Sequence, residues 1–185
     1  MHLLEHEVWV MDQVSSFLSN DFAIHALDGS TIGRIRTEGG ALGRMLMGSR
    51  ELTVLDMDGT PLLRLQDTMT LGRERMVITD GTGGPLAHLV KRITLFKTRF
   101  TVEFDGQPLD LTGSIWGFDF TMSGPRGQMA TVARSWAGVA KALLGRSRYV
   151  VHLTPELVAR ERLVVLGTVI ALDLVRAKQD RSSAG

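Results

Sequence analysis

The sequence contains no cysteine among its 185 residues. This absence excludes disulfide bridges, thiolate metal sites, thiol nucleophiles and palmitoylation. The first seven residues also lack the basic segment and the long apolar segment of a signal peptide. We therefore expect a cytoplasmic protein, free in solution or peripheral at a membrane.

A large excess of charge of one sign is also lacking, because the formal net charge is +1. This balance argues against nucleic-acid binding through bulk charge. The charged residues are nevertheless unevenly distributed along the sequence. Residues 1–33 hold five acids and no Lys or Arg, whereas residues 120–155 hold five bases and no acid. Either the molecule has a basic face, or strands that are distant in sequence interleave their charges in space.

A repeated Asp-Gly pair is the strongest positive signal. It occurs at 28–29, 58–59, 80–81 and 105–106, and short alternating or apolar runs flank each pair. Asp-Gly supplies the positive φ that tight hairpin turns need. The segment 124–127, Gly-Pro-Arg-Gly, is typical of a fifth, longer turn.

The runs between these turns predict twelve strands, with bounds good to about 2–4 residues. They cover 7–12, 21–27, 31–37, 51–56, 61–68, 74–79, 85–92, 99–104, 107–113, 118–122, 128–134 and 148–153. A meander of hairpins closes into an antiparallel β-barrel and so removes its edges. Residues 39–47 are expected to form a loop or one helical turn, and 136–144 a short amphipathic helix.

The C-terminal part contains the longest apolar run. Arg162 and Arg176 enclose thirteen residues whose one charge is Asp173, and Pro155 and Glu156 are expected to open the helix. Thirteen helical residues span roughly 20 Å. That is short of the ~30 Å of a bilayer core but close to the height of a barrel. We therefore predict a mainly β fold, a closed twelve-stranded barrel around a central hydrophobic C-terminal helix, and keep a membrane anchor as the alternative.

Several stretches together resemble the LURP-one-related and phospholipid scramblase-like families, which share the tubby C-terminal-like barrel. They are the Asp-Gly series, GQMATVARSW at 127–136, RYVVHL at 148–153 and LVVLGTVIALDLV at 163–175. The resemblance covers roughly residues 20–176. With the chain length, this indicates one domain over 1–185 with its core at about 20–176. The polar residues 177–185 are expected to form a frayed tail. Tubby relatives bind phosphoinositides and scramblases are associated with lipid movement, but the resemblance carries over no catalytic residues. This chain lacks the proline-rich extension and the cysteine-rich segment of animal scramblases.

Residues 53–60, TVLDMDGT, also match motif I of haloacid dehalogenase-type phosphatases. In such an enzyme Asp56 would be the nucleophile and Asp58 the general acid beside Mg²⁺. That chemistry needs a parallel α/β sheet, whereas hairpins surround this motif. We therefore interpret it as a turn, and we expect no enzyme, cofactor or metal site.

The candidate binding residues combine one aromatic residue with cations. An interfacial Trp near basic side chains suits anionic lipid headgroups, although a core Trp with solvated charges would give the same pattern. The sequence thus predicts a non-enzymatic module that binds anionic phospholipid, phosphoinositide or a protein partner, and no nucleic acid. A scramblase-like membrane protein anchored by the last helix is the alternative. The candidate residues are Lys91, Arg92, Arg134, Trp136, Lys141, Arg146 and Arg148.

Overall fold

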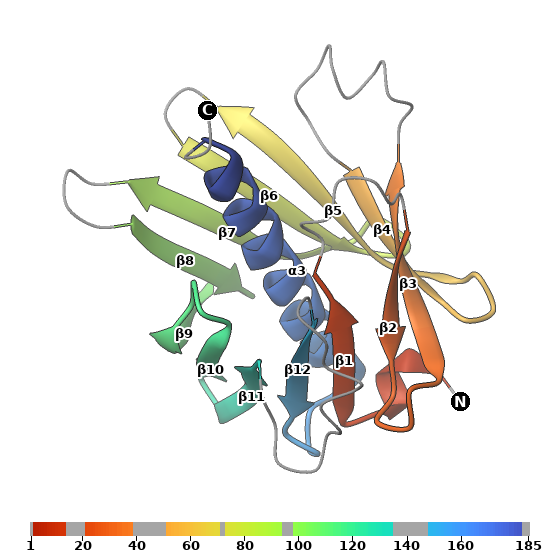
Figure 1. Cartoon of the computed structure of the whole chain (residues 1–185). Helices are drawn as coiled ribbons and strands as arrows, with labels where there is room; N and C mark the ends of the chain where they lie inside the picture. Colours follow the sequence, from red (N-terminus) through yellow and green to blue (C-terminus); the bar gives the residue numbers. More distant parts are fainter. Residues whose placement is uncertain are drawn as a thin grey trace.

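The computed structural model describes residues 2–13, 21–38, 51–70, 73–93, 98–134 and 148–182. Within these ranges, twelve antiparallel strands follow one another in sequence order and close into a barrel. One long helix, α3 (Ala159–Ser182), runs through the middle of the barrel (Figure 1). This confirms the predicted twelve-stranded antiparallel barrel around a central C-terminal helix.

Each observed strand overlaps a predicted one, and a short 3-10 turn, η1 (Leu3–Glu5), precedes the first. The strands are β1 (Val8–Asp12), β2 (Asp21–His25), β3 (Thr31–Glu38), β4 (Glu51–Asp56), β5 (Pro61–Thr70), β6 (Arg73–Asp80), β7 (Pro85–Ile93), β8 (Thr98–Phe104), β9 (Gln107–Ser114), β10 (Asp119–Gly124), β11 (Gly127–Ala133) and β12 (Arg148–Leu153). β1 pairs with β12 in five consecutive positions and so closes the barrel.

Three of the hairpin turns share one geometry. In Ala26–Ser30, Asp56–Thr60 and Asp80–Gly84, the first and fifth residues pair through backbone hydrogen bonds, and the fourth residue donates to the first. The fourth residue is a glycine with φ of 84°, 86° and 92°, respectively. These are three-residue turns with a left-handed glycine. In the third turn Gly83, rather than the predicted Gly81, supplies the positive φ.

The strand order divides the connections between two rims. We call one the hairpin rim; it carries the turns at 26–30, 56–60, 80–84, 105–106 and 124–127, and the link from β12 to α3. We call the other the far rim; it carries the turn at 115–118, the end of β11 and the start of β12. α3 starts at the hairpin rim, where Arg160 donates to Asp105, and reaches the far rim, where Arg176 lies over Phe118.

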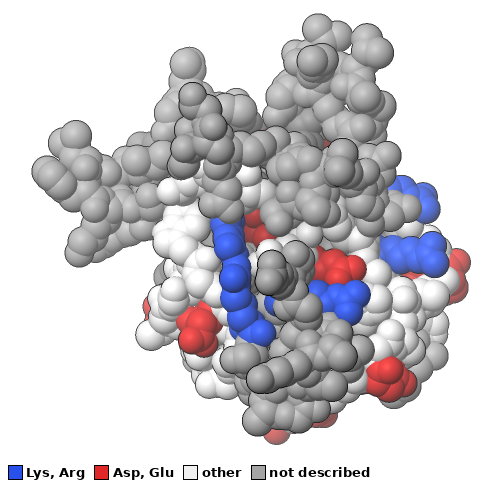
Figure 2. All heavy atoms as spheres, in the orientation of Figure 1, with Lys and Arg blue, Asp and Glu red and all other residues white. Residues whose placement is uncertain are grey.

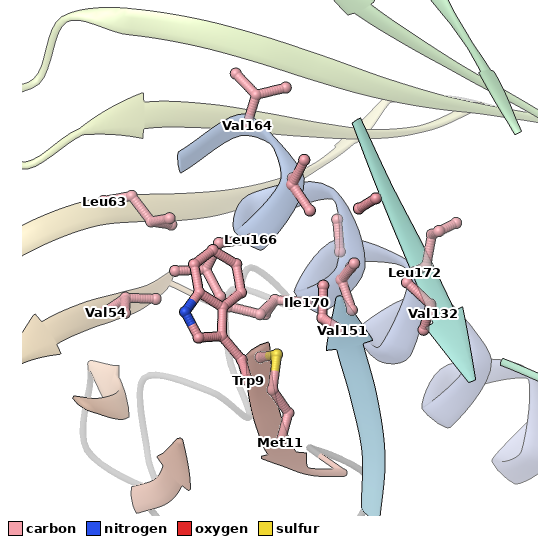
Figure 3. Packing of buried hydrophobic residues seen from close by; sticks show 14 of the residues in the cluster. Trp9, Met11, Val54, Leu63, Val132, Val151, Val164, Leu166, Ile170 and Leu172 are labelled. Atoms are coloured by element: carbon pink, nitrogen blue, oxygen red, sulfur yellow. The ribbon is translucent and has the colours of Figure 1, made fainter. Parts of the chain in front are cut away.

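The lumen is filled by α3 and the inward side chains of the strands. Residues 164–175 of α3 are all buried. Figure 3 shows Leu166 and Ile170 packed among Trp9, Val54 and Leu63 of the wall. The apolar helix is therefore buried in protein, as its length predicted.

Both ends of α3 differ from the prediction. The helix starts at Ala159, because residues 154–158 form a turn and the Glu161 carboxylate accepts the N–H of Val158. Pro155 thus precedes the first helical turn. The helix then continues to Ser182, through most of the segment expected to be frayed. The expected loop at 39–47 and helix at 136–144 lie outside the described residues.

Candidate functional site

The candidate basic residues that the structure describes lie toward the far rim. Lys91 and Arg92 are near the end of β7, Arg134 follows β11 and is exposed, and Arg148 begins β12. Trp136, Lys141 and Arg146 lie outside the described residues, in the sequence that connects β11 to β12. The strand order thus places Lys91, Arg92, Arg134 and Arg148 toward one rim.

Arg148 has a structural role that its sequence position did not reveal. Its Nε lies 2.5 Å from Asp12 Oδ1, and its Nη2 lies 3.5 Å from His25 Nε2. The His25 ring in turn lies 3.7 Å from the same carboxylate. These contacts join β12, β1 and β2. The ladder between β1 and β2 comprises two residue pairs in the described part of the chain. Because Asp12 already neutralises its guanidinium, Arg148 offers less charge to a ligand than predicted.

Trp116 is an exposed aromatic residue at the far rim that the sequence reasoning missed. It lies in the turn between β9 and β10 and is 37% exposed. Its ring contacts Phe100 edge-on, with centroids 5.2 Å apart. The sequence signal for an exposed aromatic residue was the Ile-Trp pair between Gly113 and Gly117, because turns lie on the protein surface.

The same turn closes the far end of the lumen. Phe118 has φ of 52°, is fully buried and stacks on Tyr149 with centroids 4.6 Å apart. The Arg176 guanidinium lies 5.4 Å from the Phe118 centroid. Burial raises the pKa of Tyr149 well above its usual value, and the negative charges of Asp173 and Asp12 add to this effect. The Tyr149 hydroxyl therefore stays protonated at neutral pH.

Asp56, the would-be phosphatase nucleophile, anchors the N-terminal turn instead. Its carboxylate accepts the N–H groups of Leu3 at 3.1 Å and Met57 at 2.9 Å, and lies 2.8 Å from His2 Nδ1. The Thr60 N–H, together with the Thr60 hydroxyl, holds the pKa of Asp58 below its usual value. A general acid needs the opposite shift. Both residues lie in an antiparallel hairpin, whereas the phosphatase interpretation requires a parallel sheet.

Replacing Asp56 with alanine is expected to destabilise the fold by about 2 kcal/mol, because the buried Leu3 N–H loses its acceptor. Thermal unfolding of the full chain measures this loss. Asp58→Ala, at the exposed tip of the same turn, is the matched control and should cost less than half as much. Mg²⁺-dependent phosphatase turnover that disappears in Asp56→Asn while the stability stays unchanged would overturn this structural role.

Two clefts adjoin at the hairpin rim, between the turns at 105–106 and 124–127 and the start of α3. Their volumes are about 290 and 310 Å³, and they share Phe104, Pro125, Arg126 and Glu161. Arg126 reaches Glu161 through two contacts, and Arg160 donates to Asp105 at 2.9 Å. The charged groups that line these clefts, Arg126 with Glu161 and Arg160 with Asp105, are thus paired within the chain.

Within the described ranges, no group of three or more His, Asp or Glu side chains is placed to hold a metal ion. Nor does any helix of this part of the chain combine the length and the hydropathy that a membrane crossing requires.

The chain was compared with known proteins. The family model described as LURP-one-related matches residues 7–173. An X-ray structure of a protein from Arabidopsis thaliana superposes with a TM-score of 0.57 at 16% sequence identity, over 91% of each chain. At that identity the likeness concerns the fold alone. No curated protein matches the chain. The family match extends from just before β1 to within α3 and so spans the whole barrel, and the chain belongs to the LURP-one-related family.

Proposed function

We propose that this barrel is a non-catalytic binding module of the cytoplasm that docks on anionic membrane surfaces through its far rim. The observation that carries the proposal is the charge of the segments that join strands at each rim. At the far rim these are residues 13–20, 39–50, 71–72, 94–97, 115–118 and 134–147. They contain no Asp or Glu, and their charged residues are Arg44, Arg50, Lys97, Arg134, Lys141 and Arg146.

The connections of the hairpin rim have the opposite character. Between the strands on this rim, the charged residues are Asp28, Asp58, Asp105, Arg126 and Glu156. The strands between the rims interleave both signs, and Figure 2 shows Lys and Arg beside Asp and Glu on the face of Figure 1. A molecule with this polarity turns its basic rim toward an anionic surface, because each Lys or Arg near such a surface contributes about 1 kcal/mol.

Apolar and aromatic residues accompany the basic ones in the far-rim connections. Trp116 is exposed there, and Phe17, Phe96 and Trp136 belong to the same set of connections. Amphipathic aromatic rings next to cations favour the headgroup level of a membrane. α3 is not the proposed membrane contact, because its apolar residues are buried inside the barrel. For the same reason we do not propose a scramblase anchored by this helix.

Co-sedimentation with liposomes tests the proposal. We expect the full chain to bind vesicles that contain phosphatidylserine and not neutral phosphatidylcholine vesicles, and we expect high salt to release it. Arg134→Glu combined with Lys141→Glu should weaken binding by about tenfold or more.

The matched control reverses two charges nearer the hairpin rim, Arg34→Glu with Arg64→Glu. It changes the net charge by the same amount and should retain most of the binding. If both double variants weaken binding equally, net charge rather than the far rim is responsible. If the wild-type protein binds neither vesicle, the membrane proposal is wrong.

A further inference from the structure

β8 and β9 share a turn but separate soon after it. Their ladder consists of three residue pairs, Val102–Leu109, Glu103–Pro108 and Phe104–Gln107. By contrast, β8 pairs with β7 along all seven of its residues, and β9 pairs with β10 from residue 110 to 114. Figure 1 shows β8 and β9 diverging from the turn. We call this opening, between residues 98–101 and 110–114, the β8–β9 seam.

Along the seam, backbone N–H and C=O groups of β8 and β9 face each other without forming ladder hydrogen bonds. In an antiparallel hairpin, hydrogen-bonded pairs alternate with non-bonded pairs. A two-residue turn makes Phe104–Gln107 a bonded pair, so Val102–Leu109 is bonded too. The next bonded pair in this register would join Phe100 to Leu111, but the described ladder stops before it. The N–H and C=O groups of both residues therefore point into the seam.

The side chains along the seam alternate as a half-buried strand requires. Phe100 and Leu111 point inward and are only partly buried against the core. Trp116 extends this apolar surface through its edge contact with Phe100. On the outer side Asp110 and Thr112 are exposed, and the Thr112 hydroxyl donates to Asp110 Oδ2 at 3.1 Å. An added strand would find an apolar inner face and a polar outer face.

We propose that the β8–β9 seam binds an extended segment of a partner protein, which adds as a strand to the free edge of β9. The partner's backbone pairs with the N–H and C=O of Leu111, and its alternate apolar side chains cover Phe100 and Leu111. A lipid acyl chain would cover the same side chains but leave these backbone groups buried and unpaired, which is costly. The backbone chemistry therefore favours a peptide. This inference does not depend on the membrane proposal.

Backbone amide exchange of the full chain tests both the open seam in the free protein and the binding of a peptide to it. In the free protein, the amides of Phe100 and Leu111 should exchange about tenfold or more faster than those of Val102 and Leu109, which lie within the ladder. The probe is a capped synthetic peptide with the sequence of β8, because that strand already pairs with β9 beside the turn. At saturating peptide, exchange at Leu111 should slow by about tenfold or more.

The control peptide has the same side chains but carries N-methyl groups on alternate backbone nitrogens, so it cannot pair with an edge. It should give no protection. The proposal is overturned if Phe100 and Leu111 are already protected in the free protein, which would mean that the chain fills its own seam. It is also overturned if the β8 peptide protects neither amide, if the methylated peptide protects equally, or if phosphatidylserine vesicles protect these amides and the peptide does not.

A variant provides a second test. Leu111→Pro removes an N–H that faces the seam, whereas the ladder to β10 uses the alternate residues of β9. Binding of a fluorescent β8 peptide, measured by anisotropy, should weaken at least about tenfold in this variant. Unchanged binding in a folded Leu111→Pro variant contradicts the proposal. If the variant does not fold, the comparison of the two peptides still decides the question.

Discussion

Replacing Arg162 with methionine is expected to destabilise the barrel by about 3–5 kcal/mol, because several buried carbonyl groups lose one charged donor. For a domain of this size such a loss lowers the unfolding temperature by roughly 10 °C or more. Arg162 is buried at the start of α3. Differential scanning calorimetry of the full chain measures the change.

The reason is the number of backbone segments that this one guanidinium joins. Its Nε donates to the carbonyl of Leu157 and its Nη2 to Pro155, so it fixes the link between β12 and α3. Its Nη1 donates to the carbonyls of Leu4 and His6, 3.2 and 3.0 Å away. The N-terminal turn and the start of the helix are thus held together across the hairpin rim. Hydrogen bonds to a charged donor contribute about 1.5–3 kcal/mol each to stability. A buried carbonyl that loses its donor also costs the free energy of its desolvation.

Arg160→Met is the matched control, two residues away on the same helix. Arg160 bonds an exposed carboxylate, Asp105, so its loss should cost less than about 1 kcal/mol. Arg162→Lys keeps the charge but not the planar fork, and we expect it to recover less than half of the lost stability. Equal destabilisation by Arg160→Met and Arg162→Met would contradict the distinction drawn between the two arginines.

The sequence predicted what local chemistry determines and missed what depends on contacts between distant segments. Asp-Gly pairs and alternating runs located all twelve strands, because turn conformation and side-chain period are local properties. The register between neighbouring strands is not local. The separation of β8 from β9 could therefore not be predicted, because the sequences of both strands are compatible with a complete hairpin.

The candidate site shows the same division. Strand order alone determines that Lys91, Arg92 and Arg134 lie toward the same rim. The partners of Arg148 and Arg162 do not follow from it. One pairs with Asp12, 136 positions away, and the other bonds carbonyls near the N-terminus. A sequence shows a basic residue but not the carbonyl or carboxylate that already engages it.

The second large effect is expected inside the lumen, where Gly167→Val should destabilise the fold by about 3 kcal/mol or more. A Cβ atom at Gly167 would lie 2.7 Å from Ile78 Cγ2 and 3.2 Å from its Cδ1. The barrel is closed around the helix, so neither element can move apart to relieve the overlap. Gly167→Ala should cost less, because helix propensity favours alanine by about 1 kcal/mol and offsets part of the strain. Chemical denaturation of the full chain gives the free energies of unfolding.

The origin of the effect is tested by removing the opposing side chain. Ile78→Ala alone leaves a cavity and should cost about 2–5 kcal/mol. Combined with Gly167→Val it should cost less than the sum of the single changes by about 1–3 kcal/mol, because the new methyl groups occupy the cavity. The control is Thr168→Val at the next helical position, where the buried hydroxyl has no hydrogen-bond partner within the described part of the chain. That change should be neutral or stabilising. Strict additivity of Gly167→Val and Ile78→Ala would mean that contact with β6 does not limit the side chain at this position.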